Sequence, residues 1–222
     1  MENSISEIRY AMDVLHADGF TLPTNTRGIY LGNQCLDPIL EELNRYKSVV
    51  VIHTNKPGSV PADVAEELPV PMMEFFFDTS RTVVNMILKG IFTRFADIKF
   101  VIPHAGAFLP ILADRLAAAI HMMPSTFNGH IENSSVDVYS ILGRLYYDVA
   151  GVCLPRQLPA MMQLTAADHF LYGSDFPYTP LPACMKLEET LDKTDLLTEE
   201  QHRYINYTSA LQLFPRLSQD LI

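Results

Sequence analysis

The hydrophobic positions of the chain fall into short continuous runs, separated by longer segments of helical periodicity. The runs are residues 48–54 (SVVVIHT), 99–105 (KFVIPHA), 146–151 (YYDVAG) and 169–175 (HFLYGSD), with a shorter one at 19–25 (GFTLPTN). Their apolar residues follow one another without alternating with polar residues, which is typical of parallel strands covered by helices. The sequence therefore predicts five parallel strands.

Helical patterns fill the segments between these runs. They are expected at residues 5–18, 36–47, 78–95, 109–123 and 156–166, and from about Leu181 to the end of the chain. Asp37 is the expected N-cap of the second helix, and Asp78 is expected to open the third. Since strands and helices alternate, the fold class is α/β, and the architecture is either a doubly wound sheet or a (β/α) barrel.

Chemically active side chains stand where three of the strands end. The run at 48–54 leads up to His53, the run at 99–105 leads up to His104, and the run at 169–175 ends at Asp175. Taken singly, each is most simply a hydrogen-bonded structural residue or a turn cap. No glycine-rich phosphate loop is present, and the carboxyl ends of barrel strands form the active-site rim. Together the three residues favour a barrel with a Zn²⁺ or Mn²⁺ site, one of them serving as general acid or base.

Composition narrows the classes of function. A chain of 222 residues can bury a good core, and we expect residues 1–222 to form a single domain. The formal net charge of −10 argues against a general nucleic-acid partner. The three cysteines form no C-x-x-C pair and are expected to be reduced thiols. Neither a signal peptide nor a membrane span is recognisable, so we expect a soluble, cytoplasmic protein that does not bind a membrane.

For several other residues, a structural role is a simpler explanation than a catalytic or binding role. Arg115, taken alone, is a solvated charge on a helix, and the methionines fill the core. Aromatic and apolar residues suited to a pocket for an aromatic ring are equally well explained by packing; these are Met73, Phe75, Phe76, Phe108, Phe176 and Tyr178. The remaining histidines are expected to be structural or exposed: His16, His121, His130, His169 and His202.

Five stretches of the sequence resemble the amidohydrolase-2 family, which includes aminocarboxymuconate semialdehyde, γ-resorcylate and 6-methylsalicylate decarboxylases. They are FVIPHAGAFLPILADRL, YLGNQCLDPILEEL, DTSRTVVNMILKGIFTRF, YYDVAG and LYGSDFPYTP. The resemblance extends from about Ile5 to Phe214. It implies a metal-dependent (β/α)₈ barrel that removes CO₂ from a small aromatic or unsaturated carboxylic acid without redox chemistry.

The resemblance also implies roles for individual residues. His53 matches a metal-ligating histidine, and Asp175 matches the aspartate at the metal on the last strand, where it also takes part in catalysis. His104 matches the histidine that acts as acid or base. Arg115 matches an arginine that reaches the substrate carboxylate across a dimer interface, and Phe176 is expected to contact the substrate.

The chain departs from the family at its beginning. The family's first strand carries His-x-His or Glu-x-His, whereas residues 1–15 resemble the helix before the fourth strand. We therefore expect an incomplete barrel of about strands four to eight, with a metal site lacking some ligands. The open edge at residues 19–25 would expose unpaired backbone groups, so a homo-oligomer is expected.

Three functions stay open at this point. The first is a metal-dependent decarboxylase. The second is a metal-dependent hydrolase or lactonase of the wider superfamily. The third is a non-catalytic family member that acts only through self-association. Release of CO₂ rather than ring opening separates the first from the second, and folding that depends on concentration in the absence of a bound metal marks the third.

Overall fold

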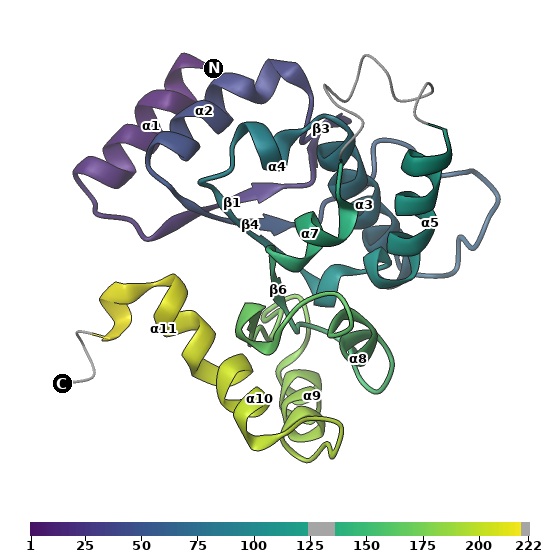
Figure 1. Cartoon of the computed structure of the whole chain (residues 1–222). Coiled ribbons are helices and arrows are strands. Elements are labelled where there is room, and N and C mark those ends of the chain that lie inside the picture. Colours follow the sequence, from purple (N-terminus) through teal and green to yellow (C-terminus); the bar gives the residue numbers. More distant parts are fainter. Residues whose placement is uncertain (124–135, 219–222) are drawn as a thin grey trace.

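The core of the structure is a parallel sheet of five strands that follow one another in chain order. The computed structural model describes residues 1–123 and 136–218 (Figure 1). The strands of the sheet are β1 (Gly19–Pro23), β4 (Val49–His53), β5 (Lys99–Ile102), β6 (Tyr146–Asp148) and β7 (Phe170–Leu171), and their order is β1-β4-β5-β6-β7. Every neighbouring pair is parallel. A doubly wound sheet reverses its order at a switch point; this one does not, which confirms the prediction of an incomplete barrel.

Helices follow each strand and connect it to the next. The α-helices are α1 (Glu2–Asp13), α2 (Asp37–Arg45), α3 (Val70–Leu88), α4 (Ile91–Arg94), α5 (Leu109–Met122), α7 (Val138–Gly143), α8 (Gln157–Met161), α9 (Leu181–Asp192), α10 (Glu199–Arg203) and α11 (Ser209–Leu213). One-turn helices lie at Gln34–Leu36, His104–Gly106, Ala167–His169 and Pro215–Ser218, and a π-helical turn lies at Tyr204–Thr208. A separate two-stranded hairpin is formed by β2 (Asn25–Thr26) and β3 (Ile29–Tyr30).

Alternate residues of the strands pack into two different clusters. Val50 and Ile52 belong to the larger cluster, whose other members come mainly from the helices after each strand. Val49 belongs to a smaller cluster on the opposite face, which contains Leu213 of α11. Since side chains two apart on a strand share a face, His53 lies on the same face as Val49. The histidine is therefore on the face opposite the main core.

Three predicted helix boundaries are wrong. Asp78 does not open a helix, because α3 begins at Val70 and Asp78 is buried in its interior. Pro71 lies in the first turn, where a missing N–H costs nothing. The same helix ends at Leu88, since Gly90 takes the left-handed conformation (φ 64°) and α4 begins after it. Asp37 is the first residue of α2 rather than its N-cap.

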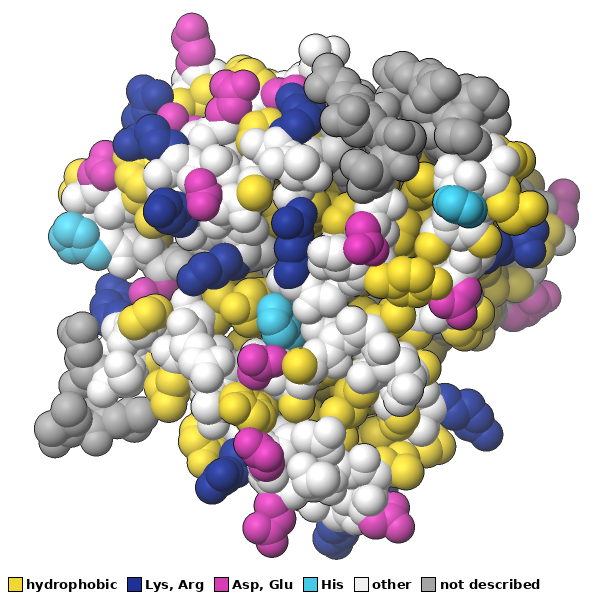
Figure 2. Space-filling model, viewed as in Figure 1, with side chains coloured by type: hydrophobic (Ala, Val, Ile, Leu, Met, Phe, Trp, Pro, Cys, Tyr) yellow, Lys and Arg dark blue, Asp and Glu magenta, His cyan; other side chains and the backbone are white. Residues whose placement is uncertain are grey.

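The surface combines charges of both signs. Figure 2 shows acidic and basic side chains interspersed on one face, with hydrophobic side chains between them. None of the described helices is long and apolar enough to cross a membrane.

An ion-pair cluster joins α1 to α2, which lie side by side in Figure 1. The Arg9 guanidinium donates from Nε (2.9 Å) and Nη2 (3.1 Å) to the two carboxylate oxygens of Glu42, and Arg45 Nη2 donates to Oε1 at 2.6 Å. These hydrogen bonds lower the pKa of Glu42 from 4.5 to about 2. A carboxylate whose pKa is lower in the folded state stabilises the fold above its unfolded pKa.

Replacing this carboxylate should destabilise the chain in a pH-dependent way. We expect Glu42→Gln to lower the free energy of unfolding at pH 7 by roughly 1 kcal/mol, because two charged hydrogen-bond partners are lost. The deficit should shrink as the pH falls from 4.5 through about 2. Urea unfolding across this range measures it, with Glu41→Gln on the exposed face of α2 as the control. An equal loss in both variants would contradict the assignment.

Candidate active site at the carboxyl ends of the strands

Four potential catalytic or metal-binding side chains lie at the carboxyl ends of four adjacent strands. His53 is the last residue of β4, and Asp148 is the last residue of β6. His104 stands two positions beyond the end of β5, and Asp175 four beyond the end of β7. Because the four strands are parallel and adjacent, these residues share one edge of the sheet.

The backbone of the His104 loop is anchored by Asp148. Oδ1 of Asp148 accepts hydrogen bonds from the backbone N–H groups of His104 (2.8 Å) and Ala150 (3.1 Å). On the other side, Gln157 Nε2 donates to the backbone oxygens of His104 and Ala107. These bonds are needed because three non-glycine residues of the loop have left-handed backbone angles, His104, Ala105 and Ala107.

The His104 side chain has unused hydrogen-bonding capacity. Its Nδ1 atom is buried, and no described residue bonds to it. The ring packs against that of Phe76, with centroids 5.6 Å apart. A buried ring nitrogen without a protein partner is available to a proton or a ligand atom, which a general acid requires.

Asp148 sits in an environment that disfavours its charge. Burial raises the pKa of the Asp148 carboxyl, and the negative charge of Asp175 raises it further. The neighbouring His104 and the two backbone donors oppose this rise without cancelling it. Carboxyl groups with raised pKa values are common in active sites. Asp148 is not among the site residues predicted from the sequence. In the run YYDVAG, however, an ionisable residue follows the first strand residues, just as in the other strands.

The His53 ring is set in one orientation by its neighbours. Nδ1 lies 2.9 Å from the Thr54 backbone oxygen, which can only accept, so Nδ1 carries the hydrogen. In the neutral ring the lone pair is then on Nε2, the usual arrangement of a metal-ligating histidine. The ring also contacts that of Tyr178, at 5.7 Å between centroids.

The loop that carries Asp175 is closed by short-range bonds. Thr179 donates from Oγ1 to Asp175 Oδ2 at 2.9 Å and from its backbone N–H to Asp175 O at 2.8 Å. The buried Cys184 thiol lies 3.2 Å from the backbone oxygens of both Ser174 and Thr179. Asp175 itself has a left-handed backbone (φ 59°). Thr179 thus fixes Oδ2 of the carboxylate, and no hydrogen bond from a described residue reaches Oδ1.

The donor chemistry of this edge suits a divalent metal ion in part. Imidazole nitrogen and carboxylate oxygen are the ligands that Zn²⁺ and Mn²⁺ accept. Within residues 1–123 and 136–218, however, no three His, Cys, Asp or Glu side chains gather closely enough to hold an ion. His53 and Asp175 would therefore supply only part of a ligand set.

The two predicted substrate contacts are both exposed. Arg115 is exposed on α5, and its guanidinium makes no hydrogen bond or ion pair with any described residue. Phe176 is 60% exposed, next to Asp175. Of the other histidines, His169 bonds through Nδ1 to the Leu145 oxygen, His16 and His121 are exposed and His202 is partly buried. His130 lies outside the described residues.

Comparisons with known proteins agree on one family. Residues 1–216 match the family described as amidohydrolase. The 6-methylsalicylic acid decarboxylase of Penicillium expansum is 34% identical over 96% of this chain and 64% of its own length. The chain thus spans less than two thirds of that relative.

Solved structures share the fold. The crystal structure of an amidohydrolase II is 42% identical, with a TM-score of 0.88 over 95% of this chain and 66% of that one. The 5-carboxyvanillate decarboxylase of Novosphingobium aromaticivorans, solved with manganese and 4-hydroxy-3-methoxy-5-nitrobenzoic acid, has a TM-score of 0.86 at 21% identity. The match covers 96% of this chain and 61% of the chain of that decarboxylase.

The raised pKa of Asp148 predicts the sign of a pH effect. A carboxyl whose folded pKa is raised stabilises the fold below its unfolded pKa, and this contribution is lost as the pH rises through the folded pKa. Asp148→Asn keeps an acceptor oxygen for both N–H donors but cannot ionise. Its stability relative to the unmodified chain should therefore increase as the pH rises above 3.8. Urea midpoints at several pH values measure this, and a pH-independent difference would contradict it.

Proposed function

The chain belongs to the amidohydrolase family, and on that premise we propose that it is the catalytic part of a metal-dependent, non-oxidative decarboxylase of a small aromatic carboxylic acid. One observation carries this proposal. His53, His104, Asp148 and Asp175 stand at the ends of four adjacent parallel strands, in a chain that is 34% identical to a 6-methylsalicylic acid decarboxylase.

The metal would be held in part by His53 and Asp175. Nε2 of His53 has its lone pair free because Nδ1 is committed to Thr54, and Oδ1 of Asp175 has no partner among the hydrogen bonds of its loop. Mn²⁺ and Zn²⁺ both accept this donor pair. When bound, a divalent ion offsets the negative charge of the substrate's oxygens. Catalytic sites of this kind have three protein ligands, so further ligands come from outside these two residues.

The reaction needs one proton delivered to carbon. Decarboxylation breaks the bond between the ring and the carboxylate, CO₂ leaves, and the electron pair stays on the ring carbon, which takes up a proton. His104 is the donor, because its ring lies at the rim of the sheet with a buried nitrogen that no described residue bonds to. Asp148 holds the backbone of His104 in place. Phe76 and Phe176 provide apolar surface beside the two catalytic loops, at His104 and Asp175.

Arg115 acts on the substrate of a second copy of the chain. Its guanidinium is exposed and unpaired among the described residues, so it is free to meet a carboxylate outside its own subunit. It lies on α5, which also carries Ile111 and Leu112 of an apolar groove. The groove, lined further by Phe77, Val84 and Phe108, offers a surface for such an association. In such a dimer, each copy lends its Arg115 to the site of the other.

Removing the proposed acid should stop turnover without removing the metal. With Mn²⁺ or Zn²⁺ supplied and 6-methylsalicylate as the substrate, we expect His104→Ala to reduce CO₂ release by at least about 100-fold, the lower range for a general acid. Elemental mass spectrometry should find unchanged metal content. His169→Ala, at the opposite end of the strands, is the control. Unchanged CO₂ release in His104→Ala, or ring opening by the unmodified chain without CO₂, would contradict the proposal.

Mixing two inactive variants tests the role of Arg115. His104→Ala and Arg115→Ala chains, unfolded together and refolded, should recover about a quarter of the activity, because half of the random dimers contain one intact site. An arginine that acts within its own chain would leave the mixture inactive. The same chains refolded separately and assayed without mixing provide the baseline.

A further inference from the structure

A further carboxylate, not among the four side chains at the strand ends, is buried on a helix. Asp78 lies in the middle of α3 with no exposed surface. A buried charge costs several kcal/mol unless donors surround it. Four donors do so: Thr24 Oγ1 (2.6 Å) and Asn25 Nδ2 (3.1 Å) bond to Oδ2, while Tyr30 Oη and Arg81 Nη1 bond to Oδ1.

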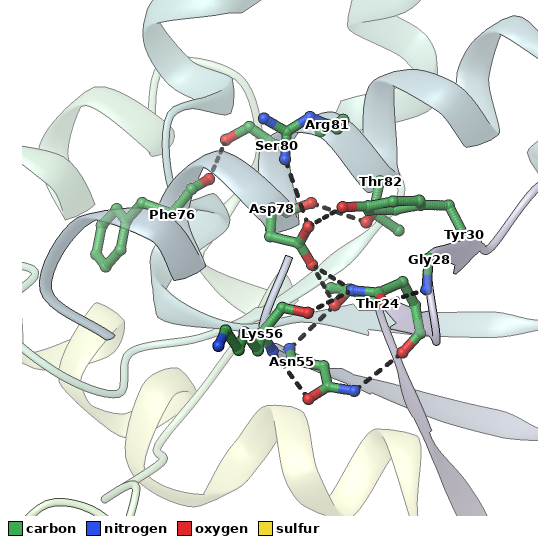
Figure 3. Close-up of polar contacts among 11 residues, drawn as sticks. Thr24, Gly28, Tyr30, Asn55, Lys56, Phe76, Asp78, Ser80, Arg81 and Thr82 are labelled. Atoms are coloured by element: carbon green, nitrogen blue, oxygen red, sulfur yellow. Dashed lines mark hydrogen bonds and ion pairs between the residues drawn. The ribbon is translucent and has the colours of Figure 1, made fainter. Parts of the chain in front are cut away.

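Three of these donors come from one short segment. Thr24, Asn25 and Tyr30 belong to the turn after β1 and the small β2–β3 hairpin (Figure 3). The hairpin turns through Arg27 and Gly28, which both have positive φ, and the Gly28 N–H donates to Asn25 Oδ1. Asp78 therefore fixes this segment against α3.

From this segment the hydrogen bonds continue to the residues beside His53. The hydroxyl of Thr24 has a single hydrogen, which it gives to Asp78, so its oxygen accepts the Asn55 backbone N–H at 3.0 Å. The Thr24 backbone N–H donates to the His53 oxygen at 2.9 Å. Thr24 thus bonds to His53 and to Asn55, the residues on either side of Thr54. The Thr54 backbone oxygen in turn orients the His53 ring.

Asn25 forms a parallel connection. Its Nδ2 atom donates to both Asp78 Oδ2 and the Lys56 backbone oxygen (3.2 Å), and its own backbone oxygen accepts Asn55 Nδ2 at 3.0 Å. The backbone of residues 53–56 is therefore bonded to Thr24 and Asn25 at the His53 oxygen, the Asn55 N–H and the Lys56 oxygen. Figure 3 shows Asn55 and Lys56 in this network.

We propose that Asp78 is a positioning residue for His53, and that it acts through the hydroxyl of Thr24 and the side chain of Asn25. The inference rests on the proposed function, in which His53 is a metal ligand. Groups behind a ligand that set its orientation typically contribute 10- to 100-fold to metal affinity. A clamp that only stabilises the fold would not have this effect.

The chain contains a matched control for this test. Thr24→Val and Tyr30→Phe each remove one hydroxyl donor from Asp78, but only Thr24 also contacts His53 and Asn55. Thr24→Ser restores the hydroxyl. Should Thr24→Val not fold, Thr24→Ala removes the hydroxyl without placing a methyl group against the carboxylate. All variants are made in the full chain, and urea unfolding measures their stability.

Two readouts are then compared: the Mn²⁺ dissociation constant, from the signal of free Mn²⁺, and the hydrogen-exchange rate of the Asn55 amide. In Thr24→Val we expect Mn²⁺ binding to weaken about 10- to 100-fold and Asn55 exchange to accelerate beyond the change in global stability. Thr24→Ser and Tyr30→Phe should leave both readouts within about twofold of the unmodified chain. Substitutions that remove no important contact usually have effects of this small size.

Equal effects of Thr24→Val and Tyr30→Phe on both readouts would overturn the proposal, since Asp78 would then be a clamp for the hairpin alone. If the unmodified chain binds no Mn²⁺, the proposed function fails for this chain. The exchange rate still decides the positioning role: selective acceleration at Asn55 in Thr24→Val supports it, and the same rate in both variants contradicts it.

Discussion

The structure depends on one constraint, the parallel pairing of five strands in the order of the chain. Each strand must return to the same end of the sheet through a helix, so all five carboxyl ends point the same way. His53, His104, Asp148 and Asp175 come from segments far apart in the sequence, and this pairing alone brings them to one edge. A change in strand order would move them apart along that edge without altering any local structure.

Two carboxylates, the partly buried Asp148 and the fully buried Asp78, then fix the geometry of that edge. Asp148 binds the backbone N–H of His104 and holds a loop with left-handed angles at three non-glycine residues. Asp78, from the interior of α3, holds the turn after β1 and through it the backbone around His53. Both are costly to bury and both are matched by donors. Asp148 bonds directly to the His104 backbone and Asp78 acts through Thr24 on the His53 backbone, and neither carboxylate bonds to a histidine ring.

The sequence predicts the parts of this account that depend on local pattern. Continuous apolar runs identify the strands, and the polar residue that ends each run identifies His53, His104 and Asp175. Asp148 meets the same criterion. Its strand is only three residues long, however, and the two tyrosines before Asp148 make the run look like part of the core rather than of a site. The role of Asp78 has no local signal, because Thr24, Asn25 and Tyr30 lie 48 to 54 positions away. Its helix begins eight residues earlier than expected because Pro71 opens it instead of ending a loop.

The central claim is that this edge of the sheet holds one metal ion, with His53 and Asp175 as two of its ligands, and paramagnetic broadening tests it most directly. Substoichiometric Mn²⁺ added to the isotope-labelled chain broadens the NMR signals of nuclei near the ion. The account predicts selective broadening at His53, His104, Asp148 and Asp175, lost in His53→Ala. Broadening centred instead on exposed residues such as His16 or Glu199, or no selective broadening at any concentration, would contradict it.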